Sequence, residues 1–96
     1  MDNSIDCIAQ EVYEWAQATF PDRTDASMFL KMYSEIAELI RSDGEPHELA
    51  DLFILLMDYA VRKNVSLLAA INEKLEINKR RSWRFNSDGT MSHIEE

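Results

Sequence analysis

The sequence contains little cysteine, glycine, proline or positive charge, and it has no long apolar run. Its single cysteine, Cys7, excludes an internal disulfide, and the lack of a Cys/His cluster disfavours a structural zinc site. Ten lysines and arginines stand against 18 acidic residues, a net charge of −8, which argues against binding to nucleic acid or to an anionic membrane. The longest apolar run, LFILLM, is far shorter than the roughly 20 residues of a membrane span. We therefore expect a soluble, cytoplasmic protein whose partners are metal ions or cationic groups.

The few glycines and prolines lie mostly where helical periodicity is interrupted, so they mark turns between helices. A chain of 96 residues is expected to form one domain, here an all-α domain over residues 1–96 with a core at about 4–82. From residue 83 onward the tail has an Asp-Gly turn signal and no helical period, which predicts an irregular segment or a weak hairpin. The apolar spacing predicts four helices, at about Ser4–Thr19, Asp25–Arg41, Pro46–Lys63 and Leu67–Arg81.

The third predicted helix, which contains LADLFILLMDYAV, is apolar around nearly all of its circumference. Such a pattern is typical of a helix that is covered on every side. Three other short helices cannot cover it completely, so we expect the helical bundle to be completed by self-association. A homodimer or a homotetramer is the expected assembly.

Two short acidic repeats flank the turn between the second and third helices: Glu35-Ile-Ala-Glu38 and Glu48-Leu-Ala-Asp51. Residues three apart project from the same face of a helix, and a short turn would place the two pairs opposite each other. Carboxylates held this close repel one another unless a cation lies between them. Oxygen ligands of this kind suit a hard divalent cation such as Mg²⁺.

Each acidic pair also has a simpler explanation. Glutamates at this spacing are common on solvated helix faces, and Glu48 in a first turn complements the helix dipole. Asp51 fits that explanation poorly, because it lies in an apolar run and an unpaired buried carboxylate is costly. The two matched pairs therefore favour a metal site. Asp58, seven residues after Asp51 on nearly the same stripe, is a weaker candidate for a further ligand.

The order of these motifs resembles a known family. An ExxE pair, a short loop and an ExxD pair that opens an apolar helix are similar to the signature of the MazG-like, all-α nucleoside triphosphate pyrophosphohydrolases. The segment EWAQATF resembles the Trp-containing first helix of some members, and INEKLEINKRRSW resembles the Lys…Asn…Arg end of their last helix. The resemblance covers roughly residues 10 to 83, and the DGTMSH tail is similar to that of small phage and bacterial members.

The resemblance implies hydrolysis of a (deoxy)nucleoside triphosphate to the monophosphate and pyrophosphate, dependent on Mg²⁺ with Mn²⁺ as a possible substitute. By matching position, Glu35, Glu38, Glu48 and Asp51 would be the metal ligands. Divalent ions there would neutralise the triphosphate and orient a water for attack. One carboxylate could instead be the general base, and Glu38 is our choice for that catalytic role.

Further residues are candidates for contacting the nucleoside triphosphate. Lys74, Asn78 and Arg81 share one stripe of the fourth helix and could reach the phosphates, although cations at a helix C-terminus also complement the dipole. Lys31, one turn before Glu35, could contact phosphate or simply pair with that acid. Trp15 could stack on a base or belong to the core.

Two other functions stay open at this point. Phosphoribosyl-ATP pyrophosphohydrolase shares the acidic signature, although the Trp-containing first segment and the DGTMSH tail fit it less well. The chain could also be a non-catalytic acidic helical module that binds a basic partner. Metal binding that depends on the carboxylates would favour an enzyme over the module.

Overall fold

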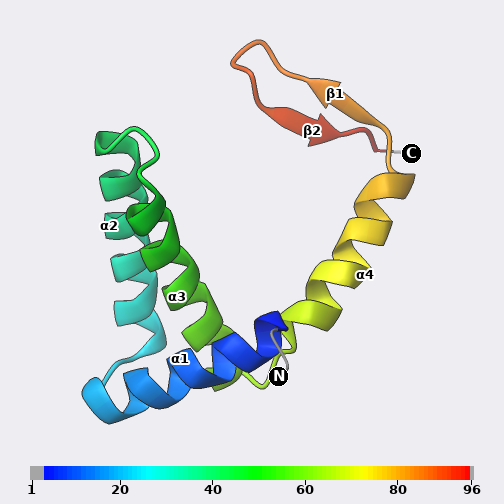
Figure 1. Cartoon of the computed structure of the whole chain (residues 1–96). Helices are drawn as coiled ribbons and strands as arrows, with labels where there is room; N and C mark the ends of the chain where they lie inside the picture. Colours follow the sequence, from blue (N-terminus) through cyan, green and yellow to red (C-terminus); the bar gives the residue numbers. More distant parts are fainter. Residues whose placement is uncertain (1–3, 96) are drawn as a thin grey trace.

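The computed structural model describes residues 4–95, and over that range it contains four helices followed by a hairpin (Figure 1). The helices lie within about one residue of their predicted limits, because the sequence marks each end with local signals. They are α1 (Ile5–Thr19), α2 (Asp25–Arg41), α3 (Pro46–Arg62) and α4 (Leu67–Arg80). The predicted all-α fold class is confirmed, and residues 83–93 add a small two-stranded sheet to it.

Side-chain caps begin all four helices, and at α3 the Glu45 carboxylate accepts hydrogen bonds from the His47 and Glu48 N–H groups. Ser4, Thr24 and Ser66 each accept a hydrogen bond from the backbone N–H three residues later, at the starts of α1, α2 and α4. Such caps satisfy N–H groups that have no partner inside the helix. The turn into α3 uses Gly44, with φ of +85°, followed by Pro46 at the first helical turn. These caps and turns explain why the helix limits could be predicted closely.

Helices α2 and α3 lie side by side and antiparallel, and α1 crosses one end of the pair (Figure 1). Helix α3 packs against both α1 and α2 and forms the centre of this three-helix unit. Only four apolar residues are buried among residues 4–95: Ala9, Ala16, Met28 and Ala60. Helix α3 is thus not fully covered within one chain, as expected: Leu49, Phe53 and Leu56 are among its exposed apolar residues.

Helix α4 extends away from the other helices and carries the hairpin at its far end (Figure 1). Its contact with α1 lies near its own start, where Asp6 accepts hydrogen bonds from the Ser66 hydroxyl (2.5 Å) and the Leu68 N–H (3.0 Å). The hairpin pairs β1 (Trp83–Phe85) with β2 (Met91–His93) in antiparallel register, so of the two predicted alternatives for the tail the hairpin is correct. A single chain therefore forms a three-helix unit and an arm.

Candidate metal centre and nucleotide pocket

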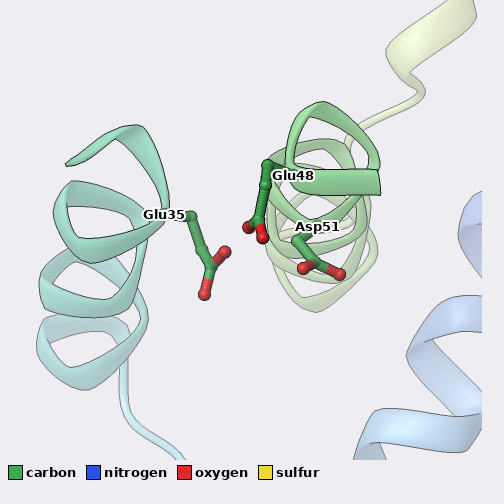
Figure 2. A group of neighbouring side chains, drawn as sticks. All are labelled: Glu35, Glu48 and Asp51. Atoms are coloured by element: carbon green, nitrogen blue, oxygen red, sulfur yellow. The ribbon is translucent and has the colours of Figure 1, made fainter. Parts of the chain in front are cut away.

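Three carboxylates from α2 and α3 converge on one point. Glu35, Glu48 and Asp51 each offer an oxygen, and these oxygens lie within 4.8 Å of one another. Glu35 extends from α2 toward α3, where Glu48 and Asp51 project from successive turns (Figure 2). Glu35 is buried, Glu48 is half-buried and Asp51 is exposed. The expectation of a buried Asp51 is wrong, because this face of α3 borders an open pocket.

The charges of this cluster are only partly compensated. The Lys31 ammonium lies 3.0 Å from Glu35 Oε1, and this contact raises the pKa of Lys31. Desolvation raises the pKa of Glu48, and the nearby charges of Asp51 and Glu35 raise it further. Three carboxylates with one largely exposed ammonium beside them form a site that a divalent cation would stabilise.

Glu38, the fourth predicted ligand and proposed base, lies one turn beyond Glu35 but outside the group of three. Its carboxylate pairs with Arg41 on the same helix, and about half of its side chain is exposed. An exposed ion pair of this type contributes little stability, so Glu38 can change partner at small cost. Its side chain also contributes to the raised pKa of Glu48, which indicates that it lies near the cluster.

An open pocket of about 760 Å³ adjoins the carboxylates. Lys31, Glu35 and Asp51 line one part of it, and Trp15 and Phe20 line another. The two aromatic rings meet edge to face with their centroids 5.7 Å apart, and more than half of each residue is exposed. Trp15 is therefore a pocket residue and not a core residue. The pocket joins an acidic part with an aromatic part, as a nucleotide with bound cations requires.

The predicted phosphate contacts on α4 do not reach this pocket within one chain. Lys74 and Asn78 lie on α4, which extends away from the other helices (Figure 1), and Arg81 caps its end. None of the three lines the pocket. The backbone carbonyl of Asn78 accepts a hydrogen bond from Trp83 Nε1 at 2.8 Å, which fixes the start of the hairpin.

A buried ion pair, Arg23 with Asp58, lies at the pocket wall and was not predicted. Asp58 had been a weak candidate for a metal ligand, but both of its oxygens accept hydrogen bonds from Arg23. The two residues are 35 apart in the sequence, so no local pattern could pair them. The pairing satisfies the carboxylate without a cation, and we correct the weaker expectation accordingly.

Comparison with a solved structure defines the class of protein. The chain is similar to the Cyanophage S-2L MazG-like pyrophosphohydrolase, solved with dGDP and three catalytic Mn²⁺ ions per active site. The TM-score is 0.87 at 38% identity, over 97% of this chain and 94% of that one. The fold is therefore that of the MazG-like class.

Sequence comparisons narrow the class to a family. The chain belongs to the dATP/dGTP pyrophosphohydrolase family, whose model matches residues 8–96. It is 41% identical over 86 residues to a dATP/dGTP diphosphohydrolase of Cyanophage S-2L, covering 88% of this chain and 82% of that protein. It is 42% identical over 81 residues to a dATP/dGTP diphosphohydrolase of Salmonella phage PMBT28, covering 83% of this chain. The matched region makes up only 28% of that phage protein's length.

These comparisons confirm the sequence-based prediction of a nucleotide pyrophosphohydrolase at the level of the family. They also support a divalent metal as the cofactor and a nucleotide as the ligand. None of the helices described between residues 4 and 95 is both long and apolar enough to cross a membrane.

Proposed function

We propose that this chain hydrolyses a purine deoxynucleoside triphosphate, dATP or dGTP, to the monophosphate and pyrophosphate, using Mg²⁺ or Mn²⁺. The observation that carries the proposal is the convergence of Glu35, Glu48 and Asp51 beside a pocket with an aromatic wall, which Trp15 and Phe20 form. The substrates named for the relatives, dATP and dGTP, fit a pocket of this kind.

The donor set fits hard divalent cations. All of the converging atoms are carboxylate oxygens, and no sulfur or imidazole nitrogen belongs to the described cluster. Divalent ions held there would neutralise the triphosphate and lower the pKa of an attacking water. Glu38 would join Glu35, Glu48 and Asp51 as a ligand after leaving Arg41, or would accept the proton of the water as general base. We keep Glu38 as the proposed base because its carboxylate is the most accessible on α2.

Two further side chains would position the substrate. Lys31 is 60% exposed and bonded to Glu35, so its ammonium can turn toward a phosphate when cations take over the charge of the carboxylate. Trp15 would stack on the base, and stacking of this kind tolerates either purine because both have a π-face. We propose both residues as substrate contacts.

We propose that the active unit is a homodimer or homotetramer. The chain exposes 7365 Å², about 1,700 Å² more than a compact monomer of its mass. Its radius of gyration is 15.9 Å, where about 12.5 Å is expected for a compact chain of this length. Leu30, Tyr33 and Ile40 on α2 are each more than two-thirds exposed and would be covered by a second copy.

Association would also bring the residues of the arm to a nucleotide. Lys74, Asn78 and Arg81 do not line the pocket of their own chain, so they would reach the phosphates bound by a neighbouring copy. The cytoplasm, which supplies nucleoside triphosphates, stays the compartment that we predict, with neither nucleic acid nor membrane as a partner.

A substrate panel tests the proposed function. Purified protein with Mn²⁺ or Mg²⁺ would be incubated with each canonical ribo- and deoxynucleoside triphosphate and with phosphoribosyl-ATP, and products would be separated by ion-exchange chromatography. We expect dATP and dGTP to be consumed fastest. Preferential turnover of phosphoribosyl-ATP would favour that alternative enzyme, and no turnover with any metal would favour the acidic interaction module.

A further inference from the structure

The Arg23–Asp58 ion pair is the most deeply buried charged contact of the described chain. Arg23 Nε lies 2.7 Å from Asp58 Oδ2, and Arg23 Nη2 lies 2.8 Å from Asp58 Oδ1. The side chains are 8% and 4% exposed. This bidentate hydrogen bond raises the pKa of Arg23. Buried ion pairs seldom stabilise a fold more than apolar residues of the same size would, so stability alone does not account for this pair.

The rest of the guanidinium group binds the end of α1. Arg23 Nη1 donates to the Phe20 carbonyl at 3.1 Å and to Gln17 Oε1 at 3.0 Å. The guanidinium carbon also lies 5.5 Å from the centre of the Tyr13 ring, a distance at which a cation is attracted to the ring. One side chain therefore joins the C-terminal end of α1, where the aromatic wall lies, to α3.

The position of Asp58 on α3 connects this joint to the carboxylate cluster. Asp58 follows Asp51 by seven residues, which is two helical turns, or about 10.5 Å along the axis on the same face. Arg23, Asp58 and Asp51 line the same pocket as Trp15 and Phe20. Because Glu48, Asp51 and Asp58 all lie on α3, fixing α1 at Asp58 sets the distance between the aromatic wall and the two carboxylates that α3 contributes.

We propose that Arg23 and Asp58 are positioning residues that set the spacing between the base-binding part and the phosphate-binding part of the pocket. This inference rests on the proposed function, since it assigns the aromatic wall to the base. It predicts that loosening the pair weakens binding of the whole nucleotide and leaves binding of its phosphate part unchanged. If the pair only stabilised the fold, loosening it would weaken binding of the whole nucleotide and of its phosphate part alike.

The test uses two variants and one matched control. Arg23→Lys keeps the charge but removes the bidentate hydrogen bond. Arg23→Met/Asp58→Leu replaces the pair with apolar side chains. Arg62→Lys alters a half-buried arginine; neither it nor its partner Asp25 lines the pocket. For each protein, KM and kcat for dGTP with Mn²⁺ would be measured, together with the inhibition constant for pyrophosphate.

We expect KM for dGTP to rise about tenfold in both pocket variants, which is within the range for losing the stacking of one base on an aromatic side chain. The inhibition constant of pyrophosphate should stay at its wild-type value, and Arg62→Lys should change neither constant. An unchanged KM in Arg23→Lys would overturn the inference, even if the double variant failed to fold. A parallel rise of KM and of the pyrophosphate constant would also overturn it, because it would show a general structural effect.

Failure of the positioning role can be distinguished from failure of the proposed function. If the wild-type protein hydrolyses no nucleotide, the proposed function fails. The positioning role would then be tested by the quenching of Trp15 fluorescence by dGTP in a Trp83→Phe background, with and without Arg23→Lys. Equal quenching in the two proteins would refute it, and weaker quenching with Arg23→Lys would support it.

Discussion

Replacing Glu35 with glutamine tests whether the carboxylate cluster is the metal centre. Glu35 is the buried member of the group, 7% exposed, and its oxygens face those of Glu48 and Asp51 on the opposite helix. Glutamine has nearly the same shape but lacks the charge and one acceptor oxygen. A cation that binds between α2 and α3 would therefore lose the ligand that joins it to α2.

The expected effect of the metal on the melting temperature can be estimated from the stability that a bound ligand adds. A cation present at 100 times its dissociation constant stabilises the folded state by about 2.7 kcal/mol. With an unfolding entropy of about 2.1 cal/mol/K per residue, a chain of 96 residues gains about 13 °C in melting temperature. We expect Mn²⁺ to raise the melting temperature of the wild-type protein by about this amount, and that of Glu35→Gln by only a small fraction of it.

Without metal the substitution should not destabilise the protein. Glutamine removes the repulsion of Glu35 by two neighbouring carboxylates. Among the described residues, the ion pair that it loses is the one with Lys31, whose ammonium is largely solvated. The metal-free variant should therefore melt at or above the wild-type temperature. This combination of equal or higher intrinsic stability and lost metal response distinguishes a ligand from a core residue.

Differential scanning fluorimetry at fixed protein concentration, with and without Mn²⁺, measures both quantities. Glu76→Gln is the matched control, because it makes the same charge change on a solvated face of α4. A full Mn²⁺ response in Glu35→Gln would refute the metal centre. A metal-free variant that is unfolded at 25 °C would instead show that Glu35 serves the core.

Three further results follow from the structure. In urea unfolding, the free energy of unfolding of Arg23→Met should be about 3 to 5 kcal/mol lower than that of the wild type, because the Asp58 carboxylate is left buried and unpaired. Adding Asp58→Leu should restore most of that loss. Equal stability of the single variant and the wild type would contradict this. Light scattering at micromolar concentration should give the mass of a dimer or tetramer, and a monodisperse monomer would exclude the proposed assembly. Hydrogen bonds from Ser66 and Leu68 lower the pKa of Asp6 below 3.8, so its contribution to stability should be present at neutral pH and lost as pH falls below that value. The melting temperatures of wild type and Asp6→Ala should therefore differ at pH 7 and converge at low pH. A difference independent of pH would contradict this.

The helices and the acidic cluster could be predicted because their signals are local. Caps such as Ser4 and Thr24, and the turn that contains Gly44, determine helix ends through hydrogen bonds that span only a few residues. Glu48 and Asp51 share a face because of helical spacing, and a short antiparallel turn brings Glu35 opposite them. The geometry of this site thus follows from two helices and the turn between them.

The remaining features depend on contacts that local patterns do not encode. Arg23 and Asp58 meet across 35 residues, and only the packing of α1 on α3 brings them together. The direction of α4 could not be predicted either, because a short apolar stripe with Leu75 does not reveal whether its partner is the same chain or another copy. Asp51 was expected to be buried because its neighbours are apolar, but those neighbours face an open pocket and uncovered surface.

The products of dGTP hydrolysis test the central claim most directly. Wild-type protein and Glu35→Gln would be incubated with dGTP and Mn²⁺, and the first products would be identified by phosphorus NMR. We predict dGMP and pyrophosphate in equal amounts from the wild type and no turnover by Glu35→Gln. Release of orthophosphate with dGDP as the first products, or full activity in Glu35→Gln, would contradict the account.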